Sequence, residues 1–401
     1  MRWEKIALRE VADFRNGINF DKSAYSSGVK LIGVSNFGER FSPDYEELQE
    51  VDPKVVRSDD FLIDGDIVFV RSNGNKELVG RCMLITEPEY SVTYSGFCIR
   101  ARIRDTNQYD PTFFTYYFKS SAFRKALSGN AVGTNIQNLS QDRLSSHIAY
   151  VPTIEMQRKI ASVLSAYDDL IENNQKQIKL LEEAAQRLYK EWFIDLRFPG
   201  HENVKIVDGV PEGWERMVLS EVTSILKRGI SPKYSDNGKY SVINQKCIRS
   251  SIMDISESRR QEKEYVPTLN LQDSDTVICS TGTGTLGRVG RVYGDYPNTT
   301  FDSHVTLVRA KENPNYIYHV VKSQQEYLMG MGRGSTNQQE LYRDVIERLV
   351  VLCPSRDILL KAERVLNAIH CKIKAVYLQN NLLVESRDRL LPKLMSGEIE
   401  V

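Results

Sequence analysis

The chain has 401 residues, about two to three domains' worth, and its 53 Lys and Arg residues balance 53 Asp and Glu residues to a formal net charge of zero. The composition, 41% hydrophobic and 26% charged, is that of a globular protein and excludes disordered and collagen-like chains. No apolar run is long enough for a membrane span or a signal peptide, and the six cysteines form no Cys-x-x-Cys pair, so we expect a cytoplasmic protein without a disulfide framework or a zinc finger.

The chain contains an internal repeat. The offset between the two copies drifts from about 211 residues near each start to 202 in the last block. In that block, twelve positions between Pro152 and Leu188 have the identical residue 202 positions later, with no gap in the alignment. Globular modules tolerate inserted loops, whereas a packed long helix does not. The positions that match early in the two copies are Trp3, Gly17 and Asp66 in the first, and Trp214, Gly229 and Asp275 in the second.

The first part of each copy is predicted to be a globular module with considerable β-sheet. Short apolar runs, such as residues 66–70 and 276–279, are bounded by Gly, Asn and Ser, which is typical of strands and turns. We assign residues 1–150 to module 1 and residues 214–352 to module 2, with a linker at 194–213 that contains Pro and Gly. The predicted fold class is therefore α/β (mixed α+β).

The last part of each copy is predicted to be a long helix, over residues 151–193 in the first copy and within residues 353–401, together with a C-terminal tail, in the second. Apolar residues recur at alternating steps of four and three, which indicates two helices paired through a coiled-coil seam, with a pseudo-twofold relation between the copies. Asn174 and Asn380 are polar residues at seam positions, and in a symmetric antiparallel pair they would face each other as a buried amide pair that fixes the register; the alternative is that both face solvent. The seam positions are Ile160, Leu164, Tyr167, Ile171, Asn174, Ile178, Leu181, Ala185, Leu188 and Trp192, and then Ala362, Leu366, Ile369, Ile373, Val376, Asn380, Leu383, Arg387, Leu390 and Leu394.

Two diverged modules that are held apart by helices of fixed length can each contact a separate site on one long, periodic partner. A helix of about 35 to 40 residues within each of these ranges spans roughly 55 Å at 1.5 Å per residue. Two half-sites on one side of duplex DNA lie about 34 Å apart. Because the modules differ at most loop positions, we expect the two half-sites to differ as well. The sequence therefore favours a DNA-binding protein with a bipartite, asymmetric target.

Two polar loops recur in both modules with their polarity kept and their residues changed. One follows the strand near Asp66 or Asp275, and the other precedes the long helix. Arg, Asn, Gln, Ser and Thr are the side chains that pair with base edges and phosphates. The candidate DNA-binding residues are Arg71, Asn73, Asn75, Lys76, Arg81, Thr134, Asn135 and Gln137 in module 1, and Ser280, Thr281, Thr283, Thr285, Arg288, Thr336, Asn337 and Gln338 in module 2.

The chain resembles, over essentially its whole length, the specificity (S) subunits of type I restriction-modification systems. The resemblance rests on the opening of each module, the strand and loop after Asp66 and Asp275, the stretch 151–160 that begins the first long helix, and the trailing residues 192–200. It implies two target-recognition domains, each recognising half of a bipartite DNA site, spaced by two antiparallel helices. It also implies that two modification subunits methylate adenine N6, so that S-adenosylmethionine, ATP and Mg²⁺ belong to partner subunits and this chain holds no cofactor or metal. Whether restriction subunits also join is left open.

Two other functions are weighed. An Asn313-Pro314-Asn315-Tyr316 stretch is similar to the motif of amino-methyltransferases, which would make the chain a DNA adenine methyltransferase itself. We favour an Asx-Pro turn that opens a helix, because the second proline of that motif is absent. The Gly-x-Gly-x-x-Gly at 282–287 lacks a following helix for a pyrophosphate. The second alternative is a coiled-coil scaffold that binds protein. For the DNA-binding prediction, the formal net charge of zero implies that the isolated chain has only modest affinity for DNA.

Overall fold

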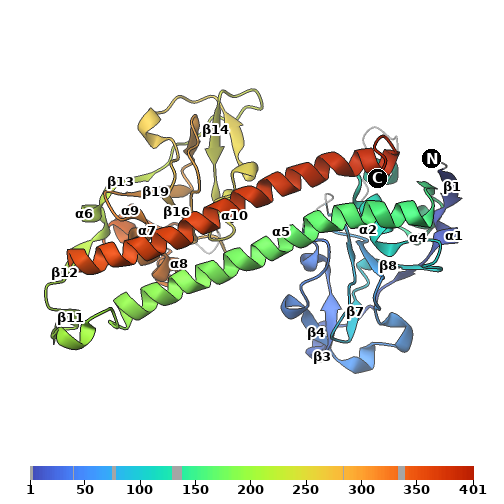
Figure 1. The fold of residues 1–401 in the computed structure, drawn as a ribbon, viewed down its shortest axis with the longest axis horizontal. Coiled ribbons are helices and arrows are strands. Elements are labelled where there is room, and N and C mark those ends of the chain that lie inside the picture. Colours follow the sequence, from blue (N-terminus) through green and yellow to red (C-terminus); the bar gives the residue numbers. More distant parts are fainter. Residues whose placement is uncertain (1–2, 39, 75–77, 129–137, 283, 333–338) are drawn as a thin grey trace. The chain divides into compact units, whose positions relative to one another are not determined.

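The computed structural model describes residues 3–38, 40–74, 78–128, 138–282, 284–332 and 339–401. The chain divides into two compact units (Figure 1), with residues 1–174 and 379–401 in unit 1 and residues 175–378 in unit 2. Each unit therefore holds one module and a part of each long helix. Among the described residues, no helix is both long and apolar enough to cross a membrane.

Module 1 is built on two sheets and a short strand pair. A four-stranded antiparallel sheet has the order β2-β8-β5-β6, and a three-stranded sheet has the order β4-β3-β7 with β3 and β7 parallel. Strands β1 and β9 pair beside the start of the long helix. The strands are β1 (Glu4–Ala7), β2 (Ala12–Asn16), β3 (Tyr25–Ile32), β4 (Gln49–Val51), β5 (Ile67–Val70), β6 (Cys82–Leu84), β7 (Val92–Tyr94), β8 (Cys98–Ile103) and β9 (Ile148–Val151). The helices are α1 (Leu8–Val11), α2 (Pro111–Lys119), α3 (Ser121–Ser128) and α4 (Gln141–Ser145).

Module 2 has the same strand order. Its four-stranded sheet is β13-β19-β16-β17, its three-stranded sheet is β15-β14-β18 with β14 and β18 parallel, and β12 pairs with β20. The strands are β12 (Glu215–Val218), β13 (Thr223–Arg228), β14 (Tyr240–Ile243), β15 (Arg259–Gln261), β16 (Thr276–Cys279), β17 (Val289–Arg291), β18 (Thr299–Phe301), β19 (Val305–Ala310) and β20 (Val350–Cys353). The helices are α6 (Leu219–Val222), α7 (Pro314–Ser323), α8 (Gln325–Gly330) and α9 (Arg343–Glu347). The mixed α/β class is confirmed, and the sequence repeat corresponds to a repeat of topology.

The repeated aspartates have the same structural role in both modules. Asp66 precedes β5 and accepts two hydrogen bonds from the guanidinium of Arg102, both at 2.7 Å. Asp275 precedes β16 and accepts the same pair from Arg309, also at 2.7 Å. A buried carboxylate is stable when it is paired and fully hydrogen-bonded, and the bidentate guanidinium provides this. The two aspartates therefore anchor the strands that lead into the predicted polar loops.

The long helices are α5 (Ile154–Tyr189), which continues as a π-helical turn over Lys190–Ile194, and α10 (Arg356–Ser396). Each begins three residues after its predicted start, because the preceding residues end strands β9 and β20. Every seam position is buried or half-buried. Between the first helix and module 2, the predicted linker contains a small hairpin of β10 (Ile206–Val207) and β11 (Val210–Pro211).

Each unit has a core that its module shares with the helices. In unit 1, Phe69 of β5 and Phe118 of α2 belong to the same buried cluster as Leu164 of α5 and Leu394 of α10. In unit 2, a second cluster joins Leu328 of α8 and Val351 of β20 to helix residues such as Tyr189 and Ala362. Burial of this apolar surface fixes each module on its helix segments.

Candidate nucleic-acid interface

The structure brings the ends of the two predicted polar loops together in each module. In module 1, Ser72 forms a β-bridge with Asn138, and the Leu139 amide donates to the Arg71 carbonyl at 2.8 Å. In module 2, Thr281 bridges Glu340, and the Leu341 amide donates to the Ser280 carbonyl, also at 2.8 Å. The described ends of the two loops, more than fifty residues apart in the sequence, thus meet at one edge of each module.

A third segment, which contains none of the predicted DNA-binding residues, completes this edge. The turn between β7 and β8 in module 1 places the Phe97 carbonyl 2.8 Å from the Arg71 amide. The turn between β18 and β19 in module 2 places the His304 carbonyl 2.8 Å from the Ser280 amide. We call this set the variable edge: residues 71–73, 95–97 and 138–139 in module 1, and residues 280–282, 302–304 and 340–341 in module 2.

The repeated glycines explain how this turn is held. A Cβ on Gly17 would lie 2.3 Å from the carbonyl oxygens of Tyr94 and Ser95, and one on Gly229 would lie 2.2 Å from that of Phe301. No side chain fits at such distances, so glycine is required wherever the backbone approaches the turn this closely. The match of Gly17 with Gly229 in the sequence is therefore a signal for the turn that carries Phe97 and His304.

The predicted residues of module 1 divide into two places. Arg71 is half-buried, and its Nη1 donates to the Gly96 carbonyl at 3.2 Å, while Asn73 follows it on the same edge. Arg81 lies on the β6 side of β5, where its carbonyl accepts from the Val70 amide. The other module 1 candidates lie outside the described residues: Asn75, Lys76, Thr134, Asn135 and Gln137.

In module 2, Thr281 is the candidate that reaches its neighbours across the edge. Its hydroxyl lies 2.6 Å from Nδ1 of His304 and 3.4 Å from Oε1 of Gln245. Ser280 is fully buried and bonds the Thr306 hydroxyl at 2.5 Å, so it supports the edge from below and cannot contact DNA. Thr285 bonds the carbonyls of its own loop. Arg288 is half-buried just before β17, and the remaining candidates, Thr283, Thr336, Asn337 and Gln338, lie outside the described residues.

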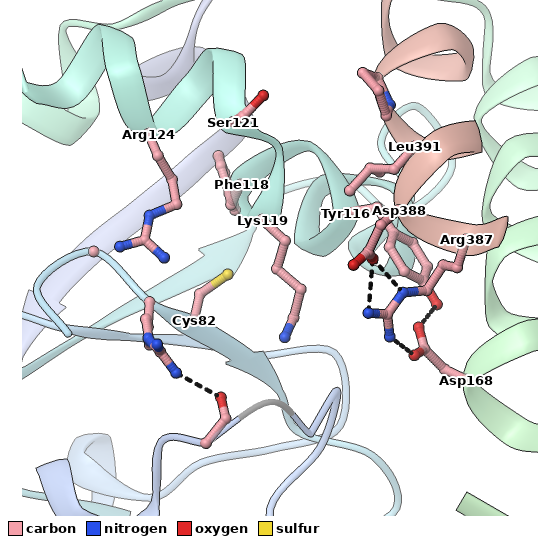
Figure 2. Close-up of a pocket in the computed structure, with 14 residues that line it drawn as sticks. Cys82, Tyr116, Phe118, Lys119, Ser121, Arg124, Asp168, Arg387, Asp388 and Leu391 are labelled. Carbon is pink, nitrogen blue, oxygen red and sulfur yellow. Dashed lines mark hydrogen bonds and ion pairs between the residues drawn. The ribbon is translucent and has the colours of Figure 1, made fainter. Parts of the chain in front are cut away.

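A polar cavity of about 340 Å³ lies within unit 1 (Figure 2). Its module side carries the cationic side chains of Arg81, Lys119 and Arg124. Its helix side carries Asp168 of α5 and Arg387 of α10, which form an ion pair. Arg81 therefore faces this cavity, with Nη1 3.5 Å from the Gly38 carbonyl.

The two enzyme-like stretches have other structural surroundings than their chemistry requires. After residues 282–287 the chain enters strand β17, so no helix N-terminus is available for a pyrophosphate. Pro314 opens helix α7, and the buried Asn315 accepts from Arg291 Nη2 at 2.6 Å and donates to Glu363. Tyr316 donates its hydroxyl proton to the Leu352 carbonyl. These polar groups are satisfied inside the fold, which argues against a methyltransferase site here.

Two modules with one topology, and with one edge that carries different side chains, define a protein with two related but distinct recognition domains. The family model described as "Type I restriction modification DNA specificity domain" matches residues 1–183 and 211–357. The chain belongs to this family.

Relatives of known name agree with this assignment. The chain is 28% identical over 304 residues to the type I restriction enzyme MjaIX specificity subunit of Methanocaldococcus jannaschii, covering 72% of this chain and 69% of that protein. It is 23% identical to the HindI specificity subunit of Haemophilus influenzae, covering 99% of both. In fold it is similar to the crystal structure of an S subunit from M. genitalium, with a TM-score of 0.57, 19% identity, and coverage of 98% of this chain and 96% of that one. The chain is thus a non-catalytic DNA specificity subunit.

Proposed function

We propose that the chain recognises a bipartite, asymmetric sequence in double-stranded DNA, one half with each module, and docks two adenine-N6 methyltransferase subunits. The observation that carries the proposal is the variable edge, where backbone hydrogen bonds such as those of Arg71 and Ser280 are shared by the two modules while most side chains differ. A shared framework with exchanged side chains is what two related domains need in order to recognise two different half-sites. The complex would act in the cytoplasm, and its methyl-transfer chemistry would come from the partner subunits.

Within this proposal, Arg71, Asn73 and Thr281 contact DNA from the variable edge, together with the candidate loop residues beyond the described part of the chain. Arg288, just before β17, and Arg81, which faces the cavity of unit 1, stay predicted DNA contacts that would bind phosphates rather than bases. Because the formal net charge is zero, we expect the partner subunits to supply much of the backbone affinity.

The experiment maps N6-methyladenine across the host genome with the gene intact and deleted. We expect deletion to remove methylation at one motif, made of two unlike half-sites separated by a fixed gap. Supplying the gene again on a plasmid should restore it. If the methylation pattern is the same with and without the gene while its methyltransferase partner is expressed, the proposed function is wrong and the scaffold alternative gains support.

We further propose that the helices pair as an antiparallel coiled coil whose register is set by Asn174 and Asn380. In unit 1 these buried side chains face each other, with Nδ2 of Asn174 2.9 Å from Oδ1 of Asn380. Nδ2 of Asn380 also lies 3.4 Å from the Ile171 carbonyl. A buried amide pair is satisfied in one alignment only, since a shift along the helices would leave both amides without partners.

Replacement of Asn174 alone by leucine is expected to lower the free energy of unfolding by about 1 to 3 kcal/mol, because the Asn380 amide loses its main partner in a buried place. The double variant Asn174→Leu/Asn380→Leu should recover this stability and permit other registers. Thermal melting measures the first effect, and the gap length in the methylated motif measures the second. A double variant that methylates one gap length only would show that the register is set elsewhere.

A further inference from the structure

We infer that Phe97 and His304 are equivalent specificity-determining residues, one at the variable edge of each module, and that Phe97 recognises a thymine through its 5-methyl group whereas His304 hydrogen-bonds a base edge. This inference rests on the proposed function and names the contacts that the two half-sites would make. Neither residue is among the DNA-binding residues that the sequence predicts.

The two residues occupy equivalent positions, because the same three backbone hydrogen bonds surround each of them. In module 1, Gly17 donates to Cys98 and Ile18 donates to Tyr94; in module 2, Gly229 donates to Val305 and Ile230 donates to Phe301. The strand-end amides of Arg71 and Ser280 then donate to the carbonyls of Phe97 and His304. The side chains therefore leave the same point of the same framework.

Phe97 is exposed where its surroundings are buried. Its residue exposure is 62%, whereas the neighbouring positions 92–96 and 98–101 are buried. Exposed apolar surface of this size is unfavourable in water and becomes favourable once a ligand covers it. The turn between β7 and β8 that carries Phe97 is held in place by three hydrogen bonds. The Arg71 guanidinium donates to the Gly96 carbonyl at 3.2 Å, and the Arg71 and Ser72 amides both donate to the Phe97 carbonyl.

A phenyl ring has no hydrogen-bonding atom, so it distinguishes base pairs in the major groove by apolar contact. The thymine C5-methyl group is the apolar feature that the four bases present there. The Arg71 guanidinium, which donates to the carbonyl of the preceding residue Gly96, provides a cation for the adjacent phosphate or base. Phe97 therefore fits a position occupied by a thymine.

His304 presents a different chemistry from the same point. It is exposed, and the Thr281 hydroxyl lies 2.6 Å from its Nδ1, so the ring is oriented and Nε2 remains for a ligand. The His304 amide donates to Oδ1 of Asp302 at 2.9 Å, which fixes the turn. An imidazole nitrogen held in this way can make one directed hydrogen bond to a base edge.

The test uses the complex of the full chain with its methyltransferase subunits and duplexes that carry the motif mapped by methylation. Each thymine is replaced in turn by deoxyuridine, which removes only the methyl group. We expect one replacement in the half-site of module 1 to weaken binding of the unaltered complex about 3- to 10-fold, the effect of losing one buried methyl contact. Phe97→Ala should weaken binding to the thymine duplex by a similar or larger factor and show no further loss with deoxyuridine, whereas Phe97→Leu should keep part of the discrimination.

The matched variant is His304→Ala. It should relax one position of the other half-site about 5- to 100-fold, the range for a single base contact, and leave the half-site of module 1 unchanged. Thermal melting of each variant shows whether it folds. If folded Phe97→Ala keeps the wild-type loss with deoxyuridine, or if folded His304→Ala keeps wild-type discrimination at every position, the inference is overturned. If the unaltered complex does not distinguish the mapped motif from a scrambled duplex, the proposed function fails instead.

Discussion

Replacement of Arg387 by alanine is expected to lower the free energy of unfolding of unit 1 by about 3 to 5 kcal/mol, the cost of leaving one partner of a mostly buried ion pair alone. Arg387 of α10 pairs with Asp168 of α5, and the two side chains are only 17% and 13% exposed. Asp168 also accepts the hydroxyl proton of Tyr116, at 2.5 Å, from helix α2. Three elements of unit 1 therefore meet at this carboxylate.

Thermal or urea unfolding measures the loss, and Arg389→Ala is the matched control on the same helix. Arg389 pairs with Glu385 at an exposed i,i+4 position, where its side chain is 78% exposed, so its removal should change stability by no more than about 0.5 kcal/mol. The double variant Asp168→Leu/Arg387→Leu should recover most of the stability, because an apolar pair leaves no buried charge. If Arg387→Ala and Arg389→Ala are equally stable, the buried ion pair of Asp168 and Arg387 does not stabilise unit 1 as expected.

Unit 2 is expected to lose stability as the pH falls below about 6.5, through two buried histidines. His319 of α7 and His370 of α10 face each other with 3.0 Å between their Nε2 atoms, and Nδ1 of His370 lies 2.8 Å from the Tyr293 hydroxyl. Burial, with Arg291 and Lys322 nearby, lowers the pKa of His319 to about 3, and burial together with Arg291 and His319 lowers the pKa of His370 further.

The direction of the pH effect follows from the difference in proton binding between the unfolded and the folded chain. Above pH 6.5 both histidines are neutral whether the chain is folded or unfolded, and the stability of the folded state is fully present. Between pH 6.5 and about 3 the unfolded chain binds protons that the folded chain excludes, so the free energy of unfolding falls. By pH 5 the loss should reach about 2 kcal/mol for each histidine.

Melting curves between pH 7.5 and pH 5 measure this loss, since most carboxylates remain ionised over that range. The variant His319→Gln/His370→Gln cannot titrate at these positions and should show a flatter dependence than the wild type. The control variant is His201→Gln, which removes an exposed imidazole of the same unit and leaves the buried pair in place. If the double variant has the same dependence as the wild type, the two histidines do not account for the acid sensitivity of unit 2.

The ion-pair cluster of unit 1 and the histidine cluster of unit 2 occupy equivalent places in the repeat. The first consists of Tyr116, Asp168 and Arg387, and the second of Tyr293, His319 and His370. Tyr116 matches His319 at an offset of 203 residues, and Asp168 matches His370 at 202. In unit 1 the module helix is joined to the long helices through a charged pair, and in unit 2 through neutral imidazoles and a phenol. The contact between module and long helix therefore lies at the same place in both copies of the repeat, but it is made by charged groups in unit 1 and by neutral groups in unit 2.

The sequence by itself determined the repeat, the mixed α/β class and the two long helices. These features are encoded locally: seam positions such as Leu164 and Ile373 follow the helical period, and strands such as β5 and β16 are short apolar runs between turn residues. The two polar loops could be found for the same reason, because their position after a repeated aspartate is visible in the chain.

Only the tertiary structure decided which loop residues face outward and which distant residues lie beside them. Ser280 and Thr281 are adjacent polar residues, yet one is buried against Thr306 and the other reaches His304, because side chains alternate across a strand. Phe97 comes beside Arg71 because β5 pairs with β8 across a sheet order that sequence spacing does not specify. The contacts of the variable edge are long-range backbone hydrogen bonds, and their pairing is a property of the folded sheet.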